Sequence, residues 1–291
     1  MTNYLLPEFR HVEETIYAYD NLQLKNIEKF SLIDLYIGNR PKNESFCGII
    51  GLGQKYYSEC KDINDIFNSF KSKNITSSNK WMIKYNTLDE GLFIIGANMD
   101  EIIPNCNYDN NIIINSLLFT GDYYIWGLPL KKIICGNNIT INAKPNRIKL
   151  DIDFSLIKGD STYYEYIEKN FFQKYYLKGI CTKSIWNYED EIQNYYYNII
   201  ECKKGKFGSN DIDKFPNLSF NINSEAILNF EGKDLFTETK YKYFFNVILN
   251  QDFLDNTHWV FGQIFFKKFP IIIDSDYRSI TIYNNYTREV Q

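Results

Sequence analysis

Two carboxylates lie two positions apart in residues 149–159, which read KLDIDFSLIKG. Side chains at positions i and i+2 of a strand point to the same face, so Asp151 and Asp153 could reach one cavity. Two carboxylates at close range share one proton, and the ionised member can then activate a water molecule while the protonated member polarises a carbonyl. The pattern permits hydrolysis, but a strand end that carries two solvated carboxylates fits the sequence better.

Other residues that could bind a metal or act as nucleophiles are few and scattered. The chain has two histidines, His11 and His258, and six cysteines, none of which form a Cys-x-x-Cys pair. Zinc sites and thioredoxin-like motifs typically use such pairs. We therefore expect neither a metal nor a cofactor, and the even number of cysteines fits either disulfides or buried thiols.

The composition of the 291 residues excludes several classes of protein. With 44% hydrophobic and 17% aromatic residues, the chain is too apolar to be disordered. A formal net charge of −4 predicts no basic face for nucleic acid, and short basic pairs such as Lys203-Lys204 are expected to be solvated turns. No apolar run of about 18 residues occurs, so we expect no membrane span. The first residues also lack the basic and apolar segments of a secretory signal.

Short strands are expected along most of the chain. Runs of β-branched and aromatic residues are bounded by clusters of Asn, Gly, Asp and Ser, which is typical of strands separated by turns. The clearest candidates are residues 112–120, 123–130, 138–142, 243–249 and 271–274. The last is followed by a polar turn at 275–278 and a further run at 279–283, which together predict a hairpin.

Two helices are expected among these strands. The first spans residues 62–73, where Asp62 is a good N-cap and apolar residues recur on one face. The second begins near Thr162, because Thr162 and Glu165 have the spacing of a capping box. Both are expected to pack against sheets.

The segment 149–159 resembles the second active-site strand of pepsin-like aspartic peptidases, which reads roughly apolar-Leu-Asp-Thr-Gly-Thr-Ser-Leu-Ile-x-Gly. The residues in register are Leu150, Asp151, Ser155, Leu156, Ile157 and Gly159. Further segments resemble family motifs in the family's order, namely residues 46–53 (FCGIIGLG), 90–100 (EGLFIIGANMD), 123–130 (YYIWGLPL) and 259–269 (WVFGQIFFKKF). In two of these segments, Gly51 and Gly262 are expected where backbones cross beneath the aspartate loops, since a side chain would clash there.

The resemblance implies a mainly β, bilobal acid protease fold of the pepsin type with a few short helices. Residues 1–124 would form a truncated N-terminal lobe that lacks the first aspartate strand and a normal flap. Residues 125–291 would form a nearly complete C-terminal lobe. Members of the family work in secretory, vacuolar or lysosomal, or extracellular compartments, and they bind a peptide or protein between the lobes.

The resemblance also implies that the chemistry is altered. Asp151 matches the C-lobe catalytic aspartate, but the Thr-Gly-Thr that follows it in the family is Ile152-Asp153-Phe154 here. Peptide hydrolysis in this family needs a second aspartate from the other lobe, so Asp151 alone is expected to be insufficient. The expectation is an aspartic endopeptidase relative that is inactive as written. The alternatives are a non-catalytic peptide- or protein-binding pseudoprotease and a fragment of a longer active protease.

Many family members carry a disulfide in the C-lobe after the aspartate strand. Cys181 and Cys202 fall in this region, so the resemblance implies a bond between them. The oligomeric state is left open by the sequence.

Overall fold

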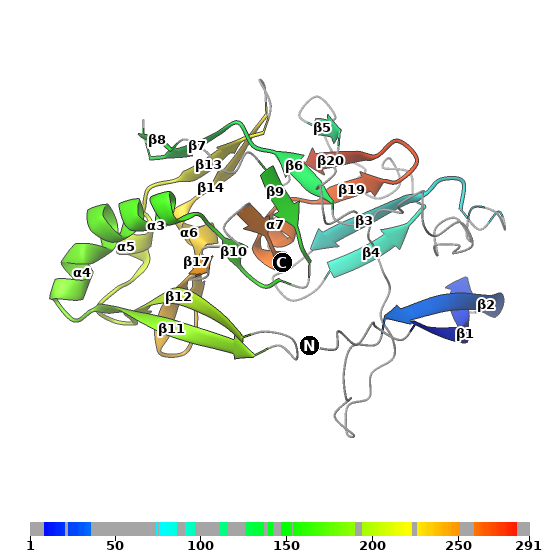
Figure 1. Ribbon diagram of the computed structural model, residues 1–291, viewed down its shortest axis with the longest axis horizontal. Coiled ribbons are helices and arrows are strands. Elements are labelled where there is room, and N and C mark those ends of the chain that lie inside the picture. The colour runs from blue at the N-terminus through cyan, green and yellow to red at the C-terminus, as the bar shows by residue number, and fades with distance from the viewer. Residues whose placement is uncertain are drawn as a thin grey trace, which may run out of the picture.

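The structure is mainly β, with several sheets and a few short helices (Figure 1). It is a computed structural model that describes residues 9–20, 23–35, 71, 74, 76–85, 91–96, 111–115, 126–136, 139–141, 147–152, 154–189, 194–222, 226–250 and 259–283. Nearly all of the helix expected at residues 62–73, the glycine-containing segment 46–53 and Asp153 therefore lie outside the described residues.

The largest sheet has nine strands and contains the segment around Asp151. Its order is β15-β16-β12-β17-β10-β18-β9-β6, and β11 pairs with β12 beside this path. The strands are β6 (Gly127–Pro129), β9 (Arg147–Leu150), β10 (Ile157–Lys158), β11 (Cys181–Glu189), β12 (Asn194–Lys203), β15 (Phe236–Glu238), β16 (Lys242–Phe245), β17 (Val247–Asn250) and β18 (Trp259–Phe261).

Two smaller sheets and one hairpin complete the β-structure that is described. A four-stranded sheet has the order β14-β13-β7-β8, a five-stranded sheet has the order β4-β3-β19-β20-β5, and β1 pairs with β2. Their strands are β1 (Phe9–Asp20), β2 (Gln23–Leu35), β3 (Lys80–Tyr85), β4 (Gly91–Ile95), β5 (Asn111–Asn115), β7 (Lys132–Cys135), β8 (Ile139–Ile141), β13 (Leu218–Asn221), β14 (Ile227–Phe230), β19 (Ile271–Asp274) and β20 (Ser279–Tyr283). The five-stranded sheet joins strands from both of the expected lobes.

The hairpin expected near the end of the chain is confirmed residue by residue. β19 and β20 pair antiparallel across a turn at residues 275–278. In that turn the Asp274 carboxylate accepts hydrogen bonds from the backbone amides of Asp276 and Tyr277 at 3.0 and 3.1 Å. This is the local side-chain hydrogen bonding for which Asp is favoured in turns.

The strand expected at residues 243–249 is divided by Asn246. The backbone amide of Asn246 donates to the carbonyl of Leu235, and the backbone carbonyl of Asn246 accepts from the backbone amide of Ile157. Its side chain accepts from the Thr237 hydroxyl and donates to the carbonyl of Asp234. These bonds change the partners of the chain at this residue, so β16 pairs with β12 and β15 whereas β17 pairs with β12 and β10. The prediction of one continuous strand was wrong.

The second expected helix begins two residues earlier than predicted. α3 (Ser161–Ile167) has Asp160 as its N-cap, because the Asp160 carboxylate accepts a hydrogen bond from the Tyr163 amide at 2.8 Å. Thr162 therefore lies in the first turn of the helix and does not cap it. The helix continues through a π-helical turn, η2 (Glu168–Phe172), into α4 (Gln173–Leu177).

The remaining described helices are short, namely α5 (Ser209–Ile212), α6 (Gly232–Leu235) and α7 (Gln263–Lys268). Figure 1 places α3, α4 and α5 together at the end of the molecule away from β19 and β20. In the part of the chain that is described, no helix is both long and apolar enough to cross a membrane.

A cluster of phenylalanines fixes these helices to the sheet. Phe172 of the π-helical turn lies 5.2 Å from Phe245 and 5.9 Å from Phe215, measured between ring centroids. Phe207 and Phe236 extend the cluster at 5.4 Å. All five side chains are buried. Burial of each such side chain contributes roughly 1.5–3 kcal/mol, so this core is a main source of the stability of residues 126–283.

Candidate functional site

Asp151 follows the end of β9, where three strands lie side by side. β18 runs parallel to β9 and antiparallel to β10, so it lies between them. The chain that links β9 to β10, residues 151–156, must therefore pass around the end of β18. We call these residues the Asp151 loop.

Gly262 lies directly beneath the Asp151 loop. Its amide donates to the carbonyl of Leu156 at 3.0 Å, and the next amide, that of Gln263, donates to the carbonyl of Phe154 at 2.7 Å. A Cβ atom on Gly262 would lie 2.0 Å from the Phe154 oxygen and 2.3 Å from the Leu156 oxygen, both of which are backbone atoms. The expectation that Gly262 allows two backbones to cross is confirmed. Gly51 lies outside the described residues.

The strand under the loop is held by a second, aromatic layer. Trp259 and Phe261 of β18 lie 4.9 and 4.8 Å from Phe220 of β13, in edge-to-face arrangements. The three side chains are fully buried. The four-stranded sheet therefore packs against the strand that supports the Asp151 loop.

Asp160 joins the end of β10 to this layer. It is buried, and its two carboxylate oxygens accept hydrogen bonds from the Tyr163 amide at 2.8 Å and the Trp259 indole nitrogen at 3.0 Å. Burial raises the pKa of Asp160 above its ordinary value, against the opposing effect of these hydrogen bonds. Asp160 was not singled out from the sequence, because its indole partner is 99 residues away.

The carboxylate of Asp151 is paired with a lysine of its own strand. The Lys149 ammonium lies 3.2 Å from the Asp151 Oδ2, and the two side chains are 24% and 30% exposed. The Asp151 amide donates to the carbonyl of Phe261 at 3.0 Å, which fixes the backbone of the loop on β18. The spacing of two positions puts both side chains on one face, so the sequence contained the signal for this pair.

The residue after Asp151 makes an apolar contact. Ile152 is partly buried and packs against the hydrophobic core, where the resembling family has a threonine. Its side chain offers no hydrogen bond to an opposite loop. Because Asp153 lies outside the described residues, the structure does not test the alternative that Asp151 and Asp153 form a dyad.

Aromatic side chains lead from the Asp151 loop along the β11–β12 hairpin. The ring of Phe154 lies 6.3 Å from that of Tyr197, which lies 6.1 Å from that of Trp186. Trp186 is 44% exposed and its neighbour Ile185 is 59% exposed. Among the described strands, β11 pairs with β12 alone. The loop therefore adjoins the exposed Trp186 ring, on a strand whose second edge pairs with no described strand, whereas Ile185 points to the opposite face.

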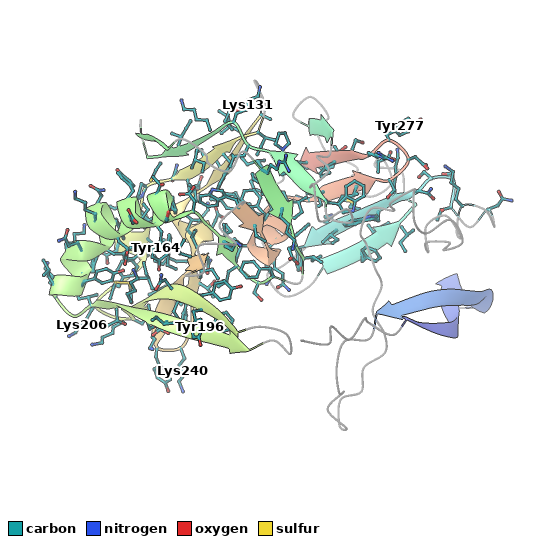
Figure 2. All side chains as sticks on the ribbon, viewed as in Figure 1. Lys131, Tyr164, Tyr196, Lys206, Lys240 and Tyr277 are labelled. Atoms are coloured by element: carbon teal, nitrogen blue, oxygen red, sulfur yellow. A yellow bond between two sulfur atoms is a disulfide. The ribbon has the colours of Figure 1, made fainter. Side chains whose placement is uncertain are left out.

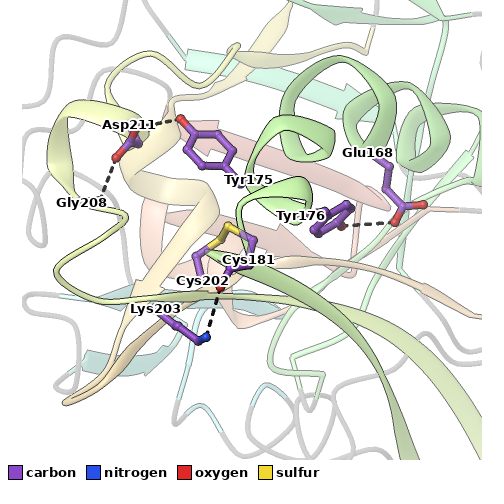
Figure 3. The surroundings of a disulfide bond; sticks show 9 residues. Glu168, Tyr175, Tyr176, Cys181, Cys202, Lys203, Gly208 and Asp211 are labelled. Carbon is purple, nitrogen blue, oxygen red and sulfur yellow. Dashed lines mark hydrogen bonds between the residues drawn. A yellow bond between two sulfur atoms is a disulfide. The ribbon is translucent and has the colours of Figure 1, made fainter.

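Cys181 and Cys202 face each other at the base of this hairpin. They are directly opposite in the β11–β12 register, with Cα atoms 4.0 Å apart, and their sulfurs are bonded (Figure 3). Beside the disulfide, the Tyr175 hydroxyl donates to the Asp211 carboxylate at 2.7 Å, which ties α4 to α5. These links hold the base of the hairpin against the helices.

The described residues contain no group of three or more His, Cys, Asp and Glu side chains that could hold a metal ion. The free thiol of Cys135 is buried, which raises its pKa to about 12. Such a thiol is protonated at neutral pH and is a poor nucleophile.

Comparison with known proteins gives a likeness in structure alone. No family model and no curated protein sequence matches the chain. The structure is matched by 380 solved protein chains. One is the crystal structure of basic 7S globulin from soybean, with a TM-score of 0.61 and 13% sequence identity over 94% of this chain and 68% of the globulin chain. This identity shows the fold and no specific family, so the chain is a mainly β protein with a pepsin-like fold.

Proposed function

We propose that this chain is a pepsin-like peptidase relative that binds an extended peptide without hydrolysing it. The observation that carries the proposal is the ion pair between Lys149 and Asp151. A catalytic aspartate of this type must share a proton with a second carboxylate and hold a water molecule. A lysine at 3.2 Å instead satisfies the charge of Asp151 locally and occupies part of the space around its carboxylate.

The change from threonine to Ile152 supports the same proposal. A hydroxyl at this position can brace the opposite half of an active site, whereas the Ile152 side chain packs into the core. The Asp151 loop therefore lacks two side-chain functions that hydrolysis requires. The Asp151 carboxylate is paired with a lysine, and Ile152 has no hydroxyl group.

The surface beside the loop supports peptide binding. Phe154, Tyr197 and Trp186 form a continuous aromatic series, and β11 has an edge that no described strand covers. An extended peptide can pair with such an edge through its main chain while its apolar side chains pack on the aromatic rings. We therefore assign the peptide to this hairpin and the adjoining Asp151 loop.

A second candidate function is peptide hydrolysis with a carboxylate that lies outside the described residues or in a longer form of the protein. The close crossing of Gly262 beneath the Asp151 loop favours it, because this backbone arrangement is costly to keep and suits the positioning of a catalytic aspartate. This candidate requires the Lys149–Asp151 pair to open when the second carboxylate arrives.

A peptide library separates the two candidates. Random ten-residue peptides would be incubated with the chain at acid and neutral pH, and bound and free fractions would be analysed by mass spectrometry. We expect recovery of intact bound peptides that are rich in apolar residues. We further expect Trp186→Ser to weaken their binding about tenfold, a loss of about 1.4 kcal/mol.

The matched control is Ile227→Ser. Ile227 is 44% exposed, as Trp186 is, but lies on β14 of the four-stranded sheet. Its substitution should leave binding unchanged. Failure to retain any peptide, or equal effects of both substitutions, would contradict the assignment to the β11–β12 hairpin. Cleaved peptides would favour the second candidate.

A further inference from the structure

Three turns meet at the base of the β11–β12 hairpin. They are residues 177–179, which begin at the last residue of α4, residues 203–206, which begin at the last residue of β12, and residues 239–242, which end at the first residue of β16. The Lys203 amide donates to the carbonyl of Ile180, and the Lys204 amide donates to the carbonyl of Tyr241. These contacts place the turns side by side, and we call them the lysine-rich end.

The lysine-rich end concentrates positive charge in a protein whose net charge is −4. It contains six lysines, all with exposed side chains, namely Lys178, Lys203, Lys204, Lys206, Lys240 and Lys242. Two of them are paired with carboxylates, Lys204 with Glu238 and Lys242 with Glu201. Among the described residues, the other four form no ion pair, so the end has an excess of four positive charges.

Two large apolar side chains project from the same turns. Leu177 is 83% exposed and Tyr241 is 69% exposed. The Lys240 ammonium lies 5.1 Å from the centre of the Tyr241 ring, so the charge and the aromatic face form one unit. Leucine and tyrosine at the tips of turns, with lysines around them, combine the two kinds of side chain that favour the boundary of an anionic bilayer.

The end is also held in shape before any ligand binds. The Cys181–Cys202 disulfide lies next to the turns at residues 177–179 and 203–206. The Lys203 ammonium donates to the carbonyl of Gly179 at 3.1 Å, and this hydrogen bond links the same two turns (Figure 3). Lys203 also lies opposite Lys242 in the antiparallel register of β12 and β16, so the backbone of the third turn is held by the sheet. A surface that is fixed in this way loses little conformational entropy on binding.

We propose that the lysine-rich end binds the surface of a negatively charged membrane. In this arrangement Leu177 and Tyr241 enter the boundary between headgroups and acyl chains, and the unpaired lysines contact anionic headgroups. The apolar tips favour a lipid surface over a nucleic acid, since a phosphate backbone offers Leu177 no apolar partner. This is binding at a membrane surface and not a membrane span, and it does not depend on the peptide-binding proposal.

The sequence alone predicted that Lys203-Lys204 is a solvated turn, and the fold brings further lysines beside it. Lys203-Lys204 looked like an isolated solvated turn, because its neighbours in space, Lys178 and Lys240, are distant in the sequence. Figure 2 labels Lys206 and Lys240 at the same end of the molecule, whereas Lys131 and Tyr277 lie elsewhere.

Sedimentation with lipid vesicles tests the proposal. The full chain would be mixed with vesicles of phosphatidylcholine alone or with about 30% phosphatidylserine, at about 0.1 M and about 0.5 M salt. We expect binding to the anionic vesicles at low salt, with at least tenfold less at high salt and on neutral vesicles. Lys206→Glu combined with Lys240→Glu should reduce binding at least tenfold, as should Leu177→Ser combined with Tyr241→Ser.

The control combines Lys131→Glu with Tyr277→Ser, which alter an exposed lysine and a 79% exposed tyrosine on other turns. It should bind as the unaltered chain does. Unchanged thermal unfolding of each variant would show that the fold is intact. Equal binding to neutral vesicles, equal loss in the control, or retention on heparin without vesicle binding would each overturn the proposal, the last in favour of a soluble polyanion.

Discussion

The inner and outer sides of the Asp151 loop differ in burial and in charge. The inner side consists of Gly262, Trp259 and Asp160, all of which are buried; Gly262 crosses beneath the loop, and Trp259 donates a hydrogen bond to Asp160. The outer side consists of Lys149, Asp151 and Phe154, which are partly exposed. The inner side holds the loop in place, whereas the outer side carries a partly exposed ion pair. The two faces of one loop therefore contribute differently to the stability of the fold.

Substitution of Gly262 by alanine should give the largest effect. The new Cβ would meet backbone oxygens of Phe154 and Leu156, which cannot move without opening the loop. We expect a loss of about 4 kcal/mol or more in the free energy of unfolding, measured in urea. Gly208→Ala is the control, because a Cβ there has no neighbour within 4 Å, and it should cost less than about 1 kcal/mol. Equal effects would show that the crossing is not tight.

Removal of the Asp160 carboxylate should have the next largest effect. Asp160→Ala leaves the buried amide of Tyr163 and the indole of Trp259 without their acceptor. We expect a loss of about 3 kcal/mol, the sum of a helix cap and an unsatisfied buried donor. Asp213→Ala, at the exposed end of α5, should change stability by less than about 0.5 kcal/mol. A small effect at Asp160 would mean that water replaces the carboxylate.

The same residue predicts a dependence of stability on pH. Because burial raises the pKa of Asp160 above its ordinary value of 3.8, the folded state holds the proton more tightly than the unfolded chain does. This contribution is complete below the unfolded pKa and is lost as the pH rises through the folded pKa. The stability of the unaltered chain relative to Asp160→Asn should therefore fall as the pH is raised above about 4. Urea unfolding at a series of pH values measures this difference, and a rise would contradict the stated direction.

Substitution on the outer side should affect stability least. The Lys149–Asp151 pair is partly exposed, so Lys149→Met should change the free energy of unfolding by less than about 1 kcal/mol. If the proposed function holds, the variant should also show no peptidase activity, because the removal of Lys149 supplies no second carboxylate. Appearance of cleavage in this variant would show that Lys149 alone suppresses a complete site.

The features that could be predicted from the sequence are those encoded locally. The β19–β20 hairpin follows from apolar runs on either side of a polar turn, whereas the role of Gly262 followed from the resemblance of residues 259–269 to a family motif. The Lys149–Asp151 pair is also encoded locally, as opposite charges two positions apart at the end of a strand.

The features that could not be predicted depend on residues far apart in the chain. Asn246 ends one strand and starts another because it bonds to Asp234, Leu235 and Ile157, none of which is marked by a local pattern. The contact between Phe154 and Tyr197 likewise arises only once the hairpin has folded beside the Asp151 loop. Periodicity reports which face of an element is apolar, but not which distant element will cover it.

Peptide cleavage at acid pH tests the central claim most directly. The purified chain and its Asp151→Asn variant would be incubated with a quenched-fluorescent peptide library, with and without pepstatin. We expect both proteins to give the same background rate, and we expect pepstatin not to change it. Cleavage that pepstatin inhibits and that Asp151→Asn abolishes would show that Asp151 still works with a second carboxylate, and it would contradict the account.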